Sequence, residues 1–287
     1  ITDSSGSRLY FMSHNKQKKI AVINDFSGFG RCSISVCLPV ISAMKIQCCA
    51  LPTAIFSNHT GFESFFFKDC TDDMEAYAGE WKKLGLKFDG IMTGFLGSHR
   101  QIEIVERFFR DFHTTECLTL VDPVMGDYGK LYPTYSEALA KDMHELVKYA
   151  DILTPNLTEA CILTGREYRE DLSEKELLDL AERLSGMGPE KVVISGLSDG
   201  SDLLNYVYQR ERTPMIVREH RVGDFRSGTG DVFASIIAAD AVSGRDFVWS
   251  VKRASSFIGR TLKRTVEMGI PKTDGICFEE FLCELGE

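Results

Sequence analysis

Short apolar runs alternate along most of this chain with longer segments in which apolar residues recur at helical spacing. The apolar runs that fit buried strands lie at 18–23, 46–56, 90–93, 117–121, 150–154 and 191–194. Segments with helical spacing lie between them, at 33–44, 71–84, 99–112, 136–149 and 174–185. Such alternation predicts a parallel sheet with helices on both faces, whose ligands collect at the carboxyl ends of the strands.

The pattern changes in the last third of the chain. Two consecutive strands are expected at 203–208 and 215–221, joined by the charged turn 209–212. Helical spacing then follows Asp231 and returns at 247–264. These segments close the predicted domain.

The number of domains is predicted from the absence of any sequence feature that would divide the chain. No repeat, low-complexity linker or shift in composition divides it, so we expect one domain at 18–287. We expect residues 1–17 to be a disordered leader of artificial origin, with the natural start near Met12, because they lack the apolar core of a secretory signal. Within the first helical segment, Pro39 should kink the helix or leave one carbonyl unpaired.

Composition narrows the class of protein. With 44% hydrophobic and 26% charged residues, the chain is typical of soluble globular proteins, and its longest apolar runs are too short to span a membrane. A net charge of −9 argues against a nucleic-acid-binding surface. The nine cysteines include no Cys-x-x-Cys pair, so they indicate neither a disulfide framework nor a zinc site, and the cytoplasm fits best.

A polar, glycine-rich turn at 226–231 runs directly into an apolar helical segment. Gly228 and Gly230 let the backbone fold tightly, and the helix adds its unpaired amides and the positive end of its dipole. Such a turn can hold an anion, and Asp231 at its end suits a base acting on a hydroxyl that attacks phosphorus. The alternative is simple helix capping. Because the chain has no Walker A motif, a phosphate site would depend on this turn.

A turn is expected at 24–31, directly after the first predicted strand, and its sequence nearly matches a dinucleotide-binding fingerprint. Gly28 and Gly30 fit that fingerprint, but Ser33 replaces its third glycine, and no acidic residue follows the next strand to hold a ribose. A dinucleotide-dependent dehydrogenase is therefore disfavoured.

Polar residues also follow later strands. Residues 57–61 come directly after the second strand, where they suit a binding site or merely satisfy a turn. Asp122 and Asp127 follow the strand at 117–121 and could help to hold Mg²⁺, although Asp122 could also cap a turn. Ser195 follows the strand at 191–194.

A helix is expected to restart after Pro155. Asn156 or Thr158 could serve only as its N-cap, with Glu159 favoured by the helix dipole.

Taken in order, several of these segments resemble the vitamin B6 kinases (pyridoxal and pyridoxamine kinases) of the ribokinase-like superfamily. The resemblance covers the chain from about Lys19 to its end and is carried by the segments 23–31, 56–61, 122–127, 154–159 and 227–231. The opening segment looks most like the bacterial pyridoxamine kinase branch. The resemblance implies a single-domain, three-layer α/β/α fold with a central, mostly parallel sheet.

It also implies ATP-dependent phosphorylation of the 5-hydroxymethyl group of pyridoxal, pyridoxamine or pyridoxine. Asp231 would be the base, and the amides of Gly228, Thr229 and Gly230 would form the anion hole. Asn156 and Glu159 would act on Mg²⁺ through water. The residues that would lie along the ATP side are Asp122, Asp127, Thr154 and Ser195.

On the ring side, His59 and Thr60 would border the pyridine ring. Phe95 stands where many pyridoxal kinases carry Tyr, so only stacking or packing is expected there. Asp25 and Ser27 replace the family's usual Ser-His-Val pattern, which leaves open which of them meets the ring nitrogen. The short segment 128–132 leaves the extent of a lid open.

Two other functions stay open at this point. The first is a hydroxymethylpyrimidine kinase of thiamine synthesis, which shares the fold and the chemistry and differs in the pocket that binds the ring. The second is a non-catalytic sensor of vitamin B6 or nucleotide, which would have the kinase fold without the kinase activity. The resemblance further implies a cytoplasmic homodimer, with a monovalent cation such as K⁺ as a further cofactor. It implies no partnership with nucleic acid or membrane.

Overall fold

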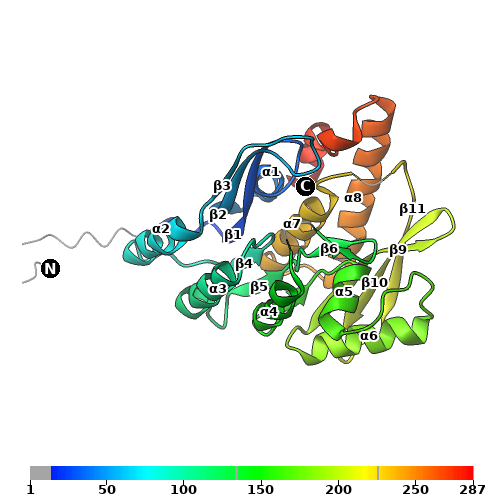
Figure 1. Ribbon diagram of the computed structural model, residues 1–287, viewed down its shortest axis with the longest axis horizontal. Helices are drawn as coiled ribbons and strands as arrows, with labels where there is room; N and C mark the ends of the chain where they lie inside the picture. Colours follow the sequence, from blue (N-terminus) through cyan, green and yellow to red (C-terminus); the bar gives the residue numbers. More distant parts are fainter. Residues whose placement is uncertain (1–13, 133–134, 225, 287) are drawn as a thin grey trace, which may run out of the picture.

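In the computed structural model, which describes residues 14–132, 135–224 and 226–286, nine strands form one sheet in the order β11-β10-β9-β8-β5-β4-β1-β2-β3 (Figure 1). The inner strands from β2 to β9 pair in parallel, and the strands at both edges pair antiparallel. The sheet strands are β1 (Lys19–Phe29), β2 (Gln47–Asn58), β3 (Phe67–Asp69), β4 (Gly90–Thr93), β5 (Leu118–Val121), β8 (Ile152–Leu153), β9 (Lys191–Asp199), β10 (Asp202–Gln209) and β11 (Met215–His220). A separate small hairpin joins β6 (Gly126–Asp127) to β7 (Lys130–Leu131).

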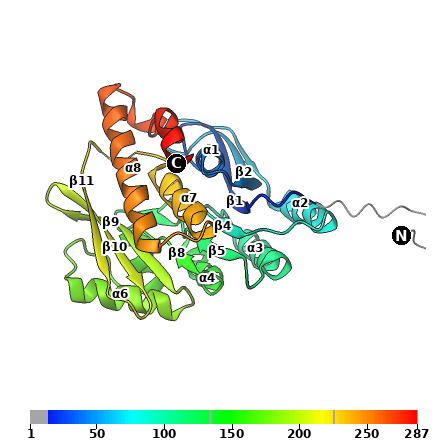
Figure 2. The same ribbon diagram turned by 180° about the vertical axis from the view of Figure 1, so that it is seen from behind.

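Helices cover both faces of this sheet (Figures 1 and 2). They are α1 (Ile34–Ala43), α2 (Thr71–Lys83), α3 (His99–Phe112), α4 (Glu137–Val147), α5 (Leu157–Thr164), α6 (Glu174–Gly186), α7 (Thr229–Val242) and α8 (Phe247–Glu267). Two 3₁₀ helices, η1 (Lys272–Asp274) and η2 (Glu279–Gly286), complete the C-terminal end.

Two apolar cores, one on each face, hold the three layers together. In β1, Ala21 and Ile23 belong to the core shared with α2 to α6, whereas Ile20 and Val22 belong to the core shared with α1, α7 and α8. This alternation is the two-residue period of a strand buried on both faces. The predicted three-layer fold is confirmed.

The sequence placed β4 and α3 at their observed bounds, and the two expected late strands are present as β10 and β11, which pair antiparallel. Helix α1 continues through Pro39. The prediction that β1 ends at residue 23 was wrong. Its backbone continues to Phe29 because β2 also continues and pairs with it, for example through Ser27 and Phe56.

The structure describes only part of the predicted leader at 1–17. Residues 1–13 of the expected leader lie outside the described residues, whereas 14–17 contact the domain. The His14 ring lies 2.9 Å from the carbonyl oxygen of Leu84, and the Gln17 amide donates to the carbonyl of Lys45. None of the helices in the described part combines the length and apolar character needed to cross a membrane.

Candidate active site

The carboxyl ends of the parallel strands bring many of the predicted site residues to one edge of the sheet. Strands β1, β4, β5, β8 and β9 are neighbours there and run in the same direction. Of the predicted residues, Phe95, Asp122, Thr154 and Asn156 follow the ends of β4, β5 and β8, whereas Asp25 and Ser27 lie within β1 and Ser195 lies within β9.

The predicted anion-binding turn leads into α7. Gly228 has φ 84°, and a Cβ there would lie 2.1 Å from the carbonyl oxygen of Arg31, so only glycine fits. Thr229 and Gly230 begin the helix, whose first-turn amides have no intrahelical partner. The guanidinium of Arg226, which is buried, donates to two carbonyls of the C-terminal segment and anchors the turn. This geometry permits an anion hole.

Asp231, the predicted base, is half-buried in the first turn of α7. Its Oδ1 accepts a hydrogen bond of 3.1 Å from the side-chain amide of Asn24, and its Oδ2 accepts one of 2.8 Å from the backbone amide of Ser33. Burial, with a further contribution from the carboxylate of Asp25, raises the pKa of Asp231 to about 6. A carboxylate with a pKa near neutrality suits general-base catalysis.

Asp122 and Asp127 lie on the side of the site that was predicted to bind ATP. The hydroxyl of Thr154 donates to Oδ1 of Asp122 at 3.0 Å, and burial together with the nearby Asp231 raises the pKa of Asp122 well above its ordinary value. Asp127 is half-buried in the β6–β7 hairpin, where the backbone amide of Tyr128 donates to it at 2.8 Å. Burial also raises the pKa of Asp127.

Asn156 and Glu159 form a reciprocal capping box at the start of α5. The Asn156 side chain accepts from the Glu159 amide at 3.0 Å, and the Glu159 carboxylate accepts from the Asn156 amide at 2.8 Å. Glu159 also accepts from the amide of Met125, and Asn156 donates to the carbonyl of Gly126, so this cap holds the β6–β7 hairpin against α5. Burial and Asp122 raise the pKa of Glu159. The capping alternative is therefore present, and a contact with metal stays a prediction.

Ser195 does not lie beyond the end of its strand, because β9 continues to Asp199. The strand bends there: Gly196 has φ 73°, and the pairing of β9 with β10 is irregular at this point. The backbone amide of Ser195 donates to the carbonyl of Pro155 at 2.9 Å, and Ser195 forms a parallel bridge with Asn156. The local structure at Ser195 therefore differs from the one expected, and its position along ATP stays a prediction.

On the predicted ring side, Asp25 is buried and its carboxylate accepts hydrogen bonds from two serine hydroxyls, those of Ser33 at 2.6 Å and Ser27 at 3.1 Å. Burial raises the pKa of Asp25, although the hydrogen bonds from the two serine hydroxyls lower it.

His59 reaches the same region from β2. A Cβ on Gly30 would lie 2.5 Å from the His59 ring, so the β1 end and the 57–61 segment pack directly together. The ring accepts from the Gly61 amide through Nδ1 and donates through Nε2 to the carbonyl of Thr273 at 2.7 Å, which assigns the neutral tautomer. Thr60 is exposed.

Phe95 lies beyond the end of β4 and is half-buried. Its ring packs edge-on against Phe56 and against Tyr135 at centroid distances of 6.5 Å and 6.0 Å. Phe95 therefore packs against other aromatic rings, and its side chain has no hydroxyl group with which to replace the contact of a Tyr.

The sequence analysis missed Asn24 and Ser33, which both bind Asp231. Asn24 follows Ile23 in β1, and the alternation of that strand assigns it to the face covered by α7. That periodicity was the available signal for Asn24. For Ser33, the signal was its place directly before α1.

Five carboxylates of the site form no salt bridge within the described residues. Among the described residues, no lysine, arginine or histidine forms a salt bridge with any of them, and burial is the largest cause of each raised pKa. The set is Asp25, Asp122, Asp127, Glu159 and Asp231. Within the described chain, no three His, Cys, Asp or Glu side chains are grouped so that they alone could hold a metal ion.

The three-layer fold, with a carboxylate in the first turn of a helix that follows a glycine turn, defines a kinase of the ribokinase-like superfamily. The chain belongs to the phosphomethylpyrimidine kinase family, whose model matches residues 37–275.

Relatives are found among solved structures and curated proteins. A Bacteroides thetaiotaomicron protein described as a phosphomethylpyrimidine kinase is 39% identical, with a TM-score of 0.94 and 96% of each chain covered. A second crystal form of that protein, described as containing pyridoxal, is 38% identical with a TM-score of 0.92. The pyridoxine/pyridoxal/pyridoxamine kinase of Bordetella avium is 29% identical over 83% of this chain and 82% of its own. The pyridoxal kinase of Ovis aries is 30% identical, and the match spans 66% of each protein, just under two thirds of that relative's length.

Proposed function

We propose that this protein is a vitamin B6 kinase, which transfers the γ-phosphoryl group of ATP to the 5-hydroxymethyl group of pyridoxal, pyridoxamine or pyridoxine. The observation that carries this proposal is the position of Asp231. Its carboxylate lies at the start of α7, next to the glycine turn, and is hydrogen-bonded to Asn24 in the middle of β1. The binding of pyridoxal to the related Bacteroides protein supports the choice of substrate.

In this proposal Asp231 accepts the proton of the hydroxymethyl group as its oxygen attacks the γ-phosphorus. The amides of Gly228, Thr229 and Gly230 donate to the phosphoryl oxygens, where negative charge increases in the transition state. The reaction needs no covalent intermediate on the enzyme. Its rate depends on alignment of the two substrates and on electrostatic stabilisation.

ATP and a divalent metal ion follow from membership of this kinase class, and we propose Mg²⁺ as the ion. Carboxylate and amide oxygens are ligands that Mg²⁺ accepts, and it commonly retains water and binds substrate phosphates as well. Asn156 and Glu159 would act on it through water, and it would neutralise charge on the triphosphate. Asp122, Asp127, Thr154 and Ser195 would lie along the ATP. A monovalent cation such as K⁺ is part of the same proposal.

On the opposite side of Asp231, the pyridine ring would lie among Asp25, Ser27, His59, Thr60 and Phe95. Two observations support this placement. The β1 end and the 57–61 segment are in contact, and Phe95 is connected to the same strand through Asn24. The site is then polar at the ring substituents and aromatic at one wall.

A coupled kinase assay tests the proposal. Wild-type protein with MgATP should phosphorylate at least one of the three vitamers with a higher kcat/KM than hydroxymethylpyrimidine or its phosphate. A preference for the pyrimidine would instead favour the thiamine-pathway kinase, for which the family name provides support. Failure with every vitamer and with the pyrimidine would favour a non-catalytic sensor. Omission of K⁺ from the same assay tests the monovalent cation.

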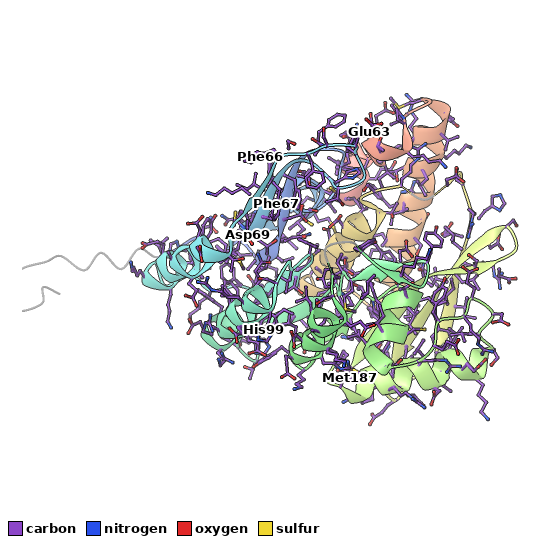
Figure 3. The ribbon with its side chains drawn as sticks, viewed as in Figure 1. Glu63, Phe66, Phe67, Asp69, His99 and Met187 are labelled. Carbon is purple, nitrogen blue, oxygen red and sulfur yellow. The ribbon has the colours of Figure 1, made fainter. Side chains whose placement is uncertain are left out.

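We also propose that the enzyme is a cytoplasmic homodimer. All nine cysteines fall in the described residues and are free thiols, which fits a reducing compartment. Exposed aromatic side chains occur at the end of β1 and in the β2–β3 segment, namely Phe29, Phe65, Phe66 and Phe67. Phe66 and Phe67 are labelled in Figure 3. An apolar surface of this kind is typical of protein interfaces. Sedimentation of the wild type and of Phe66→Ser would reveal a dimer and its dependence on this surface, and a monomeric wild type would contradict it.

A further inference from the structure

Asn24 is held in one orientation by three hydrogen bonds. Its side-chain oxygen accepts from the backbone amides of Asp25 and Phe95, each at 2.9 Å. Its side-chain nitrogen donates to Oδ1 of Asp231 at 3.1 Å. If the amide were flipped, its oxygen would face a carboxylate and its NH₂ group would face two N–H donors, so only the observed orientation satisfies all partners. The residue is 1% exposed, which excludes water as a ready substitute.

The backbone opposite Asn24 is shaped to admit this side chain. A Cβ added to Gly94 would lie 2.5 Å from both Cγ and Nδ2 of Asn24, and 2.7 Å from its Oδ1. These three atoms are the nearest neighbours of that Cβ position. A methyl group at residue 94 would therefore displace the Asn24 amide before it met any other group.

We propose that Asn24 is the positioning residue for the catalytic base: it fixes the Asp231 carboxylate relative to the ring side of the site, and the absence of a side chain at Gly94 makes this possible. Two of its hydrogen bonds connect it to ring-side backbone, at Asp25 and Phe95, and the third connects it to the base. The inference depends on the proposed function for the assay substrate. The hydrogen bonds themselves are independent of the substrate.

Other titratable groups lie within electrostatic reach of Asp231, and all of them remain in the variants tested below. They are Asp25 on β1, Asp122 after β5, Cys32 and Cys37 around the start of α1, and Tyr132 after β7. A difference between a variant at residue 24 and the wild type therefore reports the loss of the Asn24 contact.

The test is a double-mutant cycle of Asn24→Ala and Gly94→Ala. Each single variant should lower kcat by roughly 10- to 100-fold, the size expected for a misplaced catalytic group, while KM for ATP changes little. Because the three atoms nearest to a methyl group at residue 94 all belong to Asn24, Gly94→Ala should add little to the loss in the Asn24→Ala background. Losses that multiply in the double variant would overturn the proposal, since the two residues would then act separately.

A pH profile distinguishes positioning from a general loss of structure. The hydrogen bond from Asn24 lowers the pKa of Asp231, so its removal should shift the acid limb of kcat to higher pH. Asn24→Leu, which keeps most of the side-chain volume, provides a second variant if Asn24→Ala fails to fold. The matched control is Asn205→Ala, which removes an asparagine hydrogen bond of 2.9 Å to Ser255 away from this site and should leave kcat and the acid limb unchanged.

The Asp231 carboxyl can also be titrated directly by carbon-13 NMR in the wild type, in each single variant and in the double variant, with Asp231→Asn to assign its signal. A higher midpoint in the Asn24 and Gly94 variants supports the proposal, and an unchanged midpoint overturns it. This measurement needs no substrate. A wild type inactive on every vitamer would therefore disprove the proposed function, while the titration would still decide the role of Asn24.

Discussion

The backbone amide of Ser33 donates to Oδ2 of Asp231 at 2.8 Å, while the Ser33 hydroxyl donates to Oδ1 of Asp25 at 2.6 Å. Ser33 has φ 58° and ψ −140°, a conformation that residues with a side chain rarely adopt. Strain of this kind persists where the surroundings over-determine the backbone, and it is concentrated at functional sites. One strained residue thus connects the proposed base with the ring side of the site.

Asp231→Asn should lower turnover by roughly 10²- to 10⁴-fold, the range typical of a lost general base. The fold and ATP binding should stay nearly intact, because an asparagine side chain can still accept the hydrogen bond from Ser33. The measurements are kcat with the best vitamer, ATP affinity by calorimetry and the thermal unfolding midpoint. Turnover near the wild-type value would remove Asp231 from the mechanism.

The activity should also depend on pH through the same carboxylate. The pKa of Asp231 is raised to about 6, and the base acts only when it is ionised. The rate should therefore be lost as the pH falls through about 6 and should level off above it. A profile of kcat/KM between pH 5 and 8 checks this, and an acid limb near the ordinary aspartate pKa of about 4 would contradict the assignment.

Glu159→Gln should raise the Mg²⁺ concentration needed for half-maximal activity more than it changes KM for the vitamer, because a carboxylate near the triphosphate acts on the metal. Glutamine can still accept one of the two backbone hydrogen bonds that Glu159 accepts from Asn156 and Met125. The capping role is thus partly preserved. An unchanged Mg²⁺ dependence would leave Glu159 with capping alone.

Much of the fold was predictable because its signals are local. The apolar spacing of β4 and α3 identified both elements at their observed bounds. The extension of β1 to Phe29 was not predictable in the same way, because those residues are stabilised by pairing with β2 and carry no periodic apolar pattern of their own. The short edge strand β3, which also pairs with β2, was missed for the same reason.

Some residues of the candidate site could likewise be predicted from local sequence patterns, whereas contacts between distant residues could not. Asp122 and Asp231 could be selected from the sequence, since Asp122 directly follows a predicted strand and Asp231 lies between a glycine turn and a segment with helical spacing. Asp25 was selected only through the resemblance to a known family. The contact between Asn24 and Asp231 joins residues 207 positions apart, and no local pattern encodes it. The two strand ends on the ring side lie together because β1 and β2 pair in parallel.

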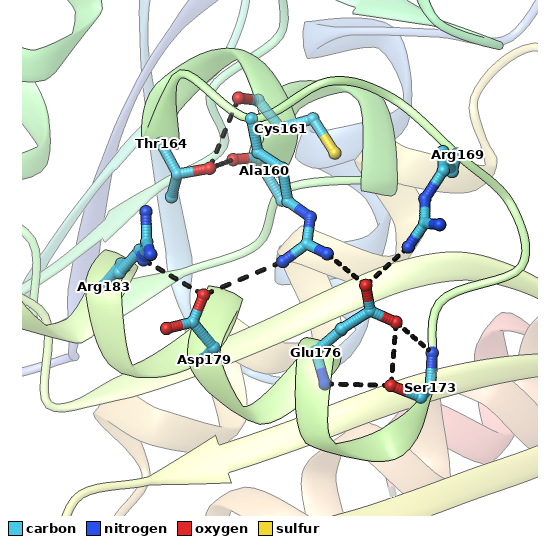
Figure 4. Close-up of polar contacts among 9 residues, drawn as sticks. Ala160, Cys161, Thr164, Arg169, Ser173, Glu176, Asp179 and Arg183 are labelled. Carbon is cyan, nitrogen blue, oxygen red and sulfur yellow. Dashed lines mark hydrogen bonds and ion pairs between the residues drawn. The ribbon is translucent and has the colours of Figure 1, made fainter.

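Away from the site, Glu176 should make stability depend on pH. Glu176 completes a capping box with Ser173 and pairs with Arg166 and Arg169 (Figure 4). Hydrogen bonds from Ser173 are the main cause that lowers its pKa from 4.5 to about 2. Its folded pKa is depressed, so its stabilising contribution is complete above pH 4.5 and is lost as the pH falls towards 2.

Glu176→Gln should therefore lower the thermal unfolding midpoint at neutral pH, and the difference from the wild type should shrink as the pH falls towards 2. The matched control is Asp179→Asn, which removes a neighbouring carboxylate that pairs with Arg183 and Arg166 without taking part in the capping box (Figure 4). Its effect should be smaller. An equal effect of both variants at every pH would assign the stability change to surface charge in general.

The last prediction concerns how the ring side discriminates between ligands. Asp25→Asn should raise KM for the vitamer and alter the preference among ring types, because a carboxylate favours a protonated pyridine nitrogen or a donor hydroxyl over a pure acceptor. Asparagine can still accept hydrogen bonds from Ser27 and Ser33, so the local structure should persist.

Thr60→Val tests the 57–61 segment on the other strand end. Loss of one neutral hydrogen bond costs about 0.5 to 1.5 kcal/mol, and an unpaired group on the ligand costs about 1 to 3 kcal/mol, so KM for the vitamer should rise several-fold to a hundredfold. Because Thr60 is exposed, the lower part of this range is expected. KM for ATP should stay unchanged in both variants, since the proposed function assigns Asp25 and Thr60 to the pyridine ring and other residues to ATP. A rise confined to ATP, or no change in either constant, would mean that the vitamer binds elsewhere.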